Sequence, residues 1–308
     1  MNRISTTDLA FSFGVDEDDI INKCGEIIDK HDFSYQPIMG QNRDELIIKI
    51  LQRIEEDVQI IGDPERKHVW EKGWQENLDE FMSGDSGESS LVPKFIRSNQ
   101  AVRFRQKYIM PDDSQFELNY FDIYRNWLFK TYLDKIENCY EFGCGTGFNL
   151  YALSKIFPEI ELWGSDFVQP SVDLASAVSQ KYQLKLNAYL FDMINPDLDK
   201  VIKQNSGVFT IGSIEQLAGK FHSFIDYLIE SKPKIVIHTE PVIELYDTNV
   251  LEDFLAYKFQ HKRGYSEGLL PYLRELENAG KINIEKIQRL NFGSLYIEGY
   301  NLIAWRPL

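Results

Sequence analysis

The chain has 308 residues, of which 43% are hydrophobic, and a formal net charge of −15 at pH 7. This length allows a substantial core in one large or two modest domains. The acidic balance disfavours a nucleic-acid substrate, because binding to phosphate backbones depends on basic surface. The sequence has no apolar run long enough to span a membrane and no signal-peptide core near its start. With three cysteines in no paired spacing, these features predict a cytoplasmic protein without a membrane partner.

Residues 1–110 are expected to form a mostly helical region that covers a substrate, and residues 111–308 a second domain. Apolar residues recur at helical spacing from Ile47 to Ile61, and Asn42 with Glu45 would cap the start of that helix. Residues 83–90 carry no apolar side chain, so they predict a flexible linker and the best boundary in the chain.

A basic stretch with interleaved aromatic residues follows this linker. No acidic residue occurs between Glu88 and Asp112, a segment that contains Lys94, Arg97, Arg103, Arg105 and Lys107. An RNA-binding strip is one interpretation, but five basic residues are few on so acidic a chain. We favour a wall for an anionic small substrate or a dock for an acidic carrier protein, with Arg103 and Arg105 as substrate-binding candidates.

From about residue 137 the pattern alternates between strands and helices. Strands are expected at 138–142, 160–166, 187–192, 207–212 and 234–238, and the intervening helical stretches imply a parallel sheet with right-handed crossovers. The end of the chain differs, because the strand-like runs 282–290 and 295–305 are joined by only four residues, 291–294. These two runs predict an antiparallel terminal hairpin.

The most informative segment is Glu141-Phe-Gly-Cys-Gly-Thr-Gly147, between the first of these strands and an apolar helix. Glycine at every second position lets the backbone bend sharply and approach a ligand, as in nucleotide-type cofactor sites. A dinucleotide fingerprint would place its third glycine at the sixth position, which here is Phe148. The glycines Gly143, Gly145 and Gly147 instead follow an acid, Glu141.

Two further acids stand where the next two strands are expected to end. Asp166 lies 19 positions after Gly147, near the place where Rossmann-like units hold ribose hydroxyls. Asp192 ends the third strand and is followed by Met193. A single aspartate here would be explained by helix capping alone. Three acids at successive strand ends favour a cofactor site.

This combination resembles the first motifs of class I S-adenosylmethionine (SAM)-dependent methyltransferases, over roughly residues 117–308. The resemblance implies an α/β fold, a Rossmann-like seven-stranded methyltransferase sheet with a terminal antiparallel hairpin, preceded here by the helical N-terminal region. It also implies SAM as the cofactor, with the acid at Asp192 beside the adenine amino group and the next apolar side chain against the ring. The cofactor-binding residues would be Glu141, Gly143, Gly145, Gly147, Asp166, Phe167, Asp192 and Met193.

The fourth and fifth strand ends would face the transferred methyl group. His238 is the expected general base, although a buried histidine bound to backbone is the alternative. Glu215 and Gln216 are further catalytic candidates, although Ser213 and Gln216 also have the spacing of a capping box.

A metal site is a second interpretation of the same strand ends. Gln216, His238 and Glu240 offer donors suited to one divalent Mn or Fe ion. The segments GSIEQL and HTEP are also similar to metal-assisted methyltransferase domains that methylate malonyl-type carbons in natural-product assembly lines. That resemblance implies a metal that stabilises an enolate.

Arg263 and Tyr265 lie between the fifth strand and the hairpin, at a usual substrate-lid position of the resembled fold. Arg263 could clamp a carboxylate or phosphate. Alternatively, basic residues 261–263 and Gly264 simply end a helix.

The sequence therefore predicts a methyltransferase for a small, anionic or carrier-tethered molecule, with O-methylation of a sugar or secondary metabolite favoured. The alternatives are a metal-assisted C-methyltransferase, a non-catalytic SAM-binding protein and a nucleic-acid methyltransferase. The acceptor atom and the oligomeric state stay open.

Overall fold

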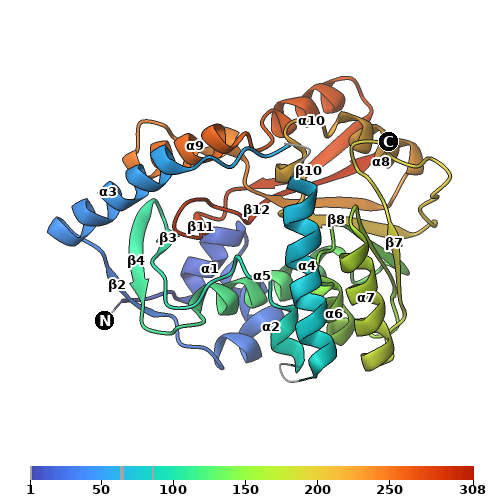
Figure 1. Ribbon diagram of the computed structural model, residues 1–308, viewed down its shortest axis with the longest axis horizontal. Helices are drawn as coiled ribbons and strands as arrows, with labels where there is room; N and C mark the ends of the chain where they lie inside the picture. The colour runs from blue at the N-terminus through green and yellow to red at the C-terminus, as the bar shows by residue number, and fades with distance from the viewer. Residues whose placement is uncertain (1, 63–65, 85–86) are drawn as a thin grey trace.

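A computed structural model describes residues 2–62, 66–84 and 87–308, which form two sheets flanked by helices (Figure 1). The larger sheet has seven strands in the order β10-β12-β9-β8-β5-β6-β7. Five strands are parallel, and β12 and β10 join the edge beside β9 in antiparallel pairing. The bounds are β5 (Asn138–Phe142), β6 (Glu161–Asp166), β7 (Leu186–Leu190), β8 (Ser206–Ile211), β9 (Ile235–Glu240), β10 (Ile282–Gln288) and β12 (Asn301–Pro307). The predicted parallel sheet with an antiparallel terminal pair is confirmed.

The central strands are covered on both faces, which explains why they appear in the sequence as continuous apolar runs. Six helices follow the N-terminal region and accompany the large sheet. They are α5 (Phe116–Tyr132), α6 (Phe148–Ile156), α7 (Gln169–Tyr182), α8 (His222–Ser231), α9 (Leu251–Arg263) and α10 (Leu269–Asn278). Short 3-10 turns, η2 (Ile214–Leu217) and η3 (Ile243–Leu245), follow β8 and β9.

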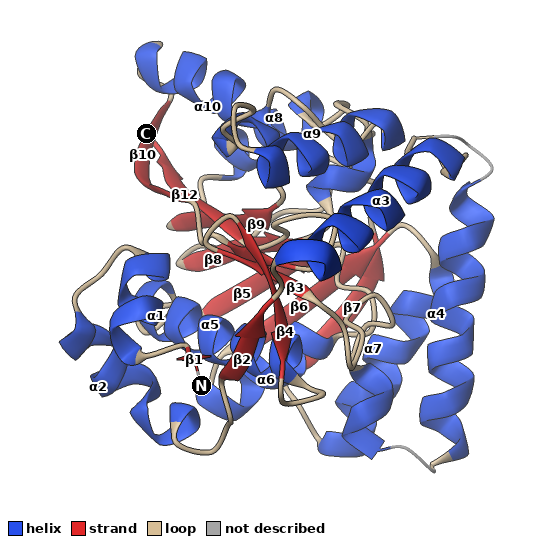
Figure 2. Cartoon of the chain, turned by 90° about the vertical axis from the view of Figure 1, so that its left-hand side faces the viewer, coloured by secondary structure: helices blue, strands red, loops and turns tan. Residues whose placement is uncertain are grey.

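The N-terminal region has the expected helices, α1 (Thr6–Phe13), α2 (Glu17–Ile28), α3 (Gly40–Glu56) and α4 (Arg66–Ser83), and the 3-10 turn η1 (Gly87–Leu91). It also contains a small sheet that we did not predict. Four of its strands are β1 (Asn2–Arg3), β2 (Ser34–Pro37), β3 (Val102–Phe104) and β4 (Lys107–Pro111), and Figure 2 shows β2, β3 and β4 grouped together. The predicted cap at Asn42 is wrong, because α3 begins at Gly40 after Met39.

The fifth strand of this small sheet, β11 (Phe292–Gly293), comes from between β10 and β12 and pairs with β3. The expected four-residue hairpin turn is therefore wrong. The chain leaves the large sheet after β10, adds a strand to the N-terminal sheet, and returns at Asn301. This excursion fastens the C-terminal strands to the N-terminal region.

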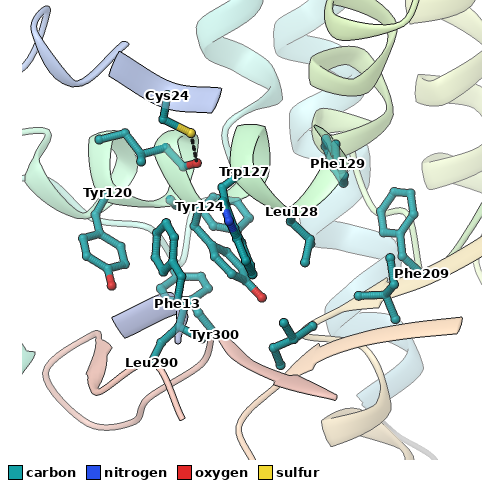
Figure 3. Close-up of a cluster of buried hydrophobic side chains, with 14 of the residues drawn as sticks. Phe13, Cys24, Tyr120, Tyr124, Trp127, Leu128, Phe129, Phe209, Leu290 and Tyr300 are labelled. Carbon is teal, nitrogen blue, oxygen red and sulfur yellow. Dashed lines mark hydrogen bonds between the residues drawn. The ribbon is translucent and has the colours of Figure 1, made fainter. Parts of the chain in front are cut away.

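Helices α1 and α2 share a core with α5 (Figure 3). The ring of Phe13 lies 5.4 Å from that of Tyr124 and 5.0 Å from that of Trp127. The Cys24 thiol donates to the Ile123 carbonyl oxygen at 3.5 Å, and this thiol is buried. Burial of large aromatic side chains is the main stabilising term in such a core.

The expected linker at 83–90 lies partly outside the described residues, since 85 and 86 are not among them. Its described part is packed, because the Asn77 amide donates to the Ser90 carbonyl oxygen at 2.8 Å and Leu91 is fully buried. In the part of the chain that the structure covers, no helix combines the length and apolarity needed to cross a bilayer.

Candidate cofactor and substrate site

The glycine turn connects β5 to α6, and its three glycines have φ values of 76°, 53° and 75°. Side chains rarely adopt this left-handed conformation, so the backbone itself favours glycine. A Cβ on Gly143 would collide with the Ser213 side chain, and one on Gly145 would lie 2.9 Å from the ring of Trp74. The amides of Gly143 and Cys144 both donate to the Ser165 carbonyl oxygen, at 2.8 and 2.9 Å. These bonds fix the turn to the end of β6.

The two acids nearest the turn are buried and hold it from within. Glu141 accepts a hydrogen bond from the Asn149 amide at 2.7 Å, and burial raises its pKa to about 8. Asp166 accepts one from the Gly145 amide at 3.0 Å, and burial raises its pKa to about 6. One oxygen of Glu141 has no partner among the described residues. Both acids therefore support the turn and the start of α6, and their predicted contact with a cofactor stays a prediction.

The other predicted cofactor residues lie beside the turn rather than at one common surface. The Asp192 carboxylate accepts from the Ile194 amide at 2.8 Å and from the Asn195 side chain at 2.9 Å. Met193 is buried, with its methyl group 3.6 Å from the position of a Cβ on Gly143, whereas Phe167 is 40% exposed. Their contact with a cofactor stays a prediction.

A cavity of about 560 Å³ opens directly above the turn. Gly143, Gly145 and Asn149 form one wall, and α3, α4 and residues 93–100 contribute another. The N-terminal region therefore contributes to the cavity wall, and its role as a substrate cover stays a prediction. Aromatic side chains are frequent in the lining: Trp70, Trp74, Phe95, Phe121, Phe148, Phe259, Tyr265, Tyr296 and Tyr300.

Glu215 and Gln216 line this cavity from η2, as expected for the end of the fourth strand. The Gln216 side-chain amide donates to Glu215 at 2.7 Å, and the Gln216 oxygen has no partner among the described residues. Burial, and then the nearby charge of Glu240, raise the pKa of Glu215 to about 8. Glu215 is thus a carboxyl group at the cavity wall that titrates near neutral pH.

The expected capping box at Ser213 is wrong. Glu240 caps η2 instead, because its carboxylate accepts from the backbone amides of Ser213, Ile214 and Glu215 at 3.1, 3.1 and 3.3 Å. The Ser213 hydroxyl donates to the Phe142 carbonyl oxygen at 2.9 Å. Glu240 therefore supports the loop that presents Glu215.

The structure does not place His238 at the cavity. Its side chain is fully buried, its Nδ1 lies 2.9 Å from the Thr210 hydroxyl, and its ring packs beside Trp305. Burial lowers its pKa to about 3, so the imidazole is neutral at physiological pH. His238 is therefore a buried histidine, which was the alternative to a general base. Its hydrogen-bond partner is the Thr210 side chain and not the backbone group that we expected.

The proposed metal triad is not assembled either. Gln216 lines the cavity, whereas Glu240 is fixed to three backbone amides and His238 is sealed beneath the surface. No group of three or more His, Cys, Asp or Glu side chains within residues 2–62, 66–84 and 87–308 is arranged to hold a metal ion. The residues present do not fit the ion that we expected.

Arg103 and Arg105 are not substrate ligands in this geometry. Arg103 is 1% exposed, donates to the Glu252 carbonyl oxygen at 2.7 Å and pairs with Asp253 at 3.1 Å. Arg105 pairs with Asp8 at 2.8 Å, away from the cavity lining. The basic residues that lie close together in the sequence are therefore separated in the fold, with Arg103 in a buried ion pair and Arg105 on the outer surface. Of the five basic residues in segment 89–111, only Arg97 lines the cavity.

Arg263 and Tyr265 do line the cavity, as expected. Arg263 is the last residue of α9, and Gly264 follows with φ of 67°, so the helix-end interpretation is also confirmed. The guanidinium of Arg263 pairs with Asp57 at 2.5 Å and lies 3.4 Å from the Tyr265 hydroxyl. Arg53 and Arg66, which we did not predict, lie beside this pair.

Sequence reasoning also missed Glu117. It lines the cavity, is 7% exposed and accepts a hydrogen bond from the Tyr300 hydroxyl at 3.0 Å. Burial raises its pKa to about 7. The available signal was an acid on the apolar face of a helix, at the same spacing as Phe121 and Tyr124. The partner, 183 residues away, had no signal.

Comparison with known proteins agrees with this geometry. No family model matches the chain. O-methyltransferase 3 of Dictyostelium discoideum is 31% identical over 125 residues, which cover 38% of this chain and 28% of that relative. The chain thus spans little more than a quarter of this curated relative. The matching stretch, the glycine turn and the sheet order together decide the fold. The chain has the class I SAM-dependent methyltransferase fold.

Solved structures resemble it only distantly. One is the [4+2]-cyclase SpnF, with 12% identity, a TM-score of 0.49, and coverage of 77% of this chain and 95% of that one. Geranyl diphosphate C-methyltransferase from Streptomyces coelicolor has 12% identity and a TM-score of 0.46, covering 76% and 98%. PigF with S-adenosylhomocysteine (SAH) has 14% identity and a TM-score of 0.44, covering 79% and 72%.

The residues of this methyltransferase fold fit a SAM molecule at the turn. Glycines leave backbone free for close approach, and the first turn of α6 offers unpaired amides to a carboxylate. Asp166 is a buried carboxylate at the end of β6, and its second oxygen accepts a long hydrogen bond, 3.4 Å, from the Val168 amide. The Phe167 amide and the Ser171 hydroxyl also act on this carboxylate, so a ribose hydroxyl would be a further donor to it.

Proposed function

We propose that this protein is a SAM-dependent methyltransferase that methylates a hydroxyl oxygen of a small molecule. One observation carries the proposal: the glycine turn and Glu215 line the same cavity. A cofactor site and an acid–base group that open into one space are what a transfer reaction requires. The curated relative, named an O-methyltransferase, supports oxygen as the acceptor atom.

SAM would be held by Glu141, Gly143, Gly145, Gly147, Asp166, Phe167, Asp192 and Met193, and it would supply an activated methyl group. The acceptor would occupy the rest of the cavity, beneath the N-terminal cover. A sugar or secondary metabolite, anionic or tethered to a carrier, would fit the polar and aromatic walls of the part of the 560 Å³ cavity that SAM leaves free. We place the reaction in the cytoplasm, because the three buried thiols suit a reducing compartment.

Glu215 takes the role that we first assigned to His238. A hydroxyl is a weak nucleophile until its proton is removed, and the best general base has a pKa near the working pH. Glu215, with a pKa of about 8, meets that condition at the cavity wall. It would accept the hydroxyl proton as the oxygen takes the methyl group, and SAH would remain as the product of the cofactor.

The test is to incubate the protein with SAM and a small-molecule extract and to detect SAH and the methylated product by mass spectrometry. Glu215→Gln should lower kcat by a factor of about 10²–10⁴ while SAH affinity is kept. Glu230→Gln is the matched control, because Glu230 is exposed on α8. SAH binding without any turnover of the extract would instead indicate a non-catalytic SAM-binding protein.

A further inference from the structure

Three arginines from separate elements meet at one side of the cavity. Arg53 is near the end of α3, Arg66 begins α4 and Arg263 ends α9, and all three line the cavity. Asp57 is shared by two of them, with a 2.5 Å contact to Arg263 and a 3.7 Å contact to Arg53. One carboxylate therefore serves two guanidinium groups.

Arg66 differs from the other two, because within the described residues it forms no ion pair with a carboxylate. Its guanidinium donates to the Gln59 side-chain oxygen at 3.3 Å and lies 5.9 Å from the ring centre of Trp70. Among the described residues, no acidic side chain approaches within 4 Å of it to form an ion pair. Burial lowers its pKa, while Tyr265, Asp57 and Glu215 act in the opposite direction. A partly buried guanidinium whose contacts among the described residues are an amide oxygen and an aromatic ring favours binding of an anion.

The charge at this place points to an anion with a single negative charge. Among the residues that the structure describes, the four arginines of the lining (Arg53, Arg66, Arg97 and Arg263) stand against Asp57, Glu117 and Glu215, so about one positive charge is left even when all three carboxyls are ionised. The whole chain is strongly acidic, with a net charge of −15. A local positive excess on such a chain is therefore a built feature of the cavity rather than a general property of the surface.

Aromatic rings continue from the arginines into the cavity. The Arg263 guanidinium lies 4.4 Å from the ring centre of Phe259, and this ring stacks on Tyr296 at 4.9 Å with an interplanar angle of 16°. On another side, Trp70 and Trp74 stack at 5.7 Å. Flat apolar surfaces of this kind bind planar rings through offset stacking.

We propose that the cavity binds an aromatic carboxylic acid, with its carboxylate on Arg66 and Arg263 and its ring against Phe259 and Tyr296. Guanidinium groups hold a carboxylate through paired, charge-assisted hydrogen bonds. A carboxylate held in this way is a poor nucleophile, so the methyl acceptor is a hydroxyl group elsewhere on the same molecule, towards Glu215. The inference rests on the proposed function for the fate of that hydroxyl, but the binding of the acid can be measured without turnover.

The experiment titrates the 308-residue chain, saturated with SAH or without it, with 4-hydroxybenzoate and with its uncharged counterpart 4-hydroxybenzamide. Calorimetry and the fluorescence of Trp70 and Trp74 report binding. We expect 4-hydroxybenzoate to bind at least about tenfold more tightly than the amide, and Arg66→Gln to remove that difference. Arg105→Gln, an exposed arginine outside the cavity, should leave it unchanged.

The variants separate binding from folding. Arg66→Gln breaks no ion pair within the described residues, so loss of fold does not explain loss of binding. Arg263→Lys keeps the positive charge beside Asp57 but removes the paired N–H donors of the guanidinium. It should lower the affinity for 4-hydroxybenzoate by about tenfold. Thermal unfolding of each variant shows whether it is folded.

Equal affinity for acid and amide, or an unchanged affinity in Arg66→Gln, overturns the inference. So does inorganic phosphate that competes as well as 4-hydroxybenzoate, because it would indicate a phosphoryl site without use of the aromatic wall. If the protein binds the acid but neither SAH nor SAM, the proposed methyl transfer fails while the anion site stands. If the protein binds SAH but not the acid, the anion site is overturned while the proposed methyl transfer stands.

Discussion

Gly145 lies in direct contact with Trp74: a Cβ built on this glycine would be 2.9 Å from ring carbon Cζ2 of the tryptophan. The contact joins the cofactor turn to α4, a helix of the N-terminal region that packs on α7 (Figure 1). This helix-to-turn contact, which we did not predict, brings the N-terminal region against the glycine turn at the cavity wall.

Gly145→Ala is expected to cost about 1–3 kcal/mol of folding free energy from backbone strain, since φ is 53° there. It should also displace Trp74 and lower SAH affinity, which calorimetry measures. Gly280→Ala is the matched control, because φ is 69° but no atom lies within 4 Å of the added Cβ. The double variant with Trp74→Ala should regain stability relative to Gly145→Ala alone. Unchanged SAH affinity in Gly145→Ala would show that the turn does not contact the cofactor.

The rate of methyl transfer should rise with pH and level off above about 8. Glu215 is useful as a base only when ionised, and its pKa is raised to about 8, so kcat/KM should increase about tenfold per unit below that value. Glu240→Gln removes the neighbouring negative charge, and we expect the midpoint of the profile to move to lower pH. A profile that is flat between pH 6 and 9 would remove Glu215 from the reaction.

Burial of Glu117 should make the protein without ligand less stable as the pH rises from about 4.5 to 7. Its pKa is about 7 in the folded state against 4.5 in the unfolded chain, so the folded state binds the extra proton in this window. Above pH 7 the ionised group carries the full cost of burial, up to about 3 kcal/mol at 1.36 kcal/mol per unit. Glu117→Gln should therefore stabilise the protein at pH 8 and have little effect at pH 4.

Urea denaturation at the two pH values measures this difference. Tyr300→Phe is the companion variant, since it removes the hydrogen bond that the Glu117 carboxylate accepts at 3.0 Å. It should destabilise more at pH 8 than at pH 4. An equal effect of Glu117→Gln at both values would mean that the pKa of this carboxyl group is the same in the folded and the unfolded state.

The sequence predicted the parts of the fold that depend on local patterns. Strands such as β9 are buried on both faces and therefore stand out as apolar runs, and the left-handed turn leaves its glycines visible. Short strands carry no such pattern. β11 has two residues, and its pairing with β3 joins positions nearly 190 residues apart. The sequence around Phe292 and Gly293 has no pattern that predicts pairing with β3.

The sequence predicted which residues stand at the ends of strands and turns. It did not predict which of their side chains point into the cavity. Glu215 and His238 both follow apolar runs, but only the folded chain shows that one lies on the cavity wall and the other packs beside Trp305. Glu117 and Tyr300 meet from opposite ends of the domain, and a basic cluster in sequence diverged in space. Contacts between side chains so far apart in the sequence depend on tertiary packing, and local sequence patterns do not predict them.

Arg103 and Arg105 provide the sharpest test of this divergence, because the same substitution two residues apart should have different effects. Arg103→Met removes a buried partner of Asp253 and Glu298, and loss of one side of such a network costs about 3–5 kcal/mol. Arg289 still pairs with Asp253 at 2.7 Å, so we expect the lower end of that range. Arg105→Met breaks an exposed pair and should cost less than about 1 kcal/mol. Urea denaturation measures both, and the KM for the acceptor should be unaffected in each folded variant. A raised KM with unchanged stability in Arg103→Met would return that arginine to the substrate site.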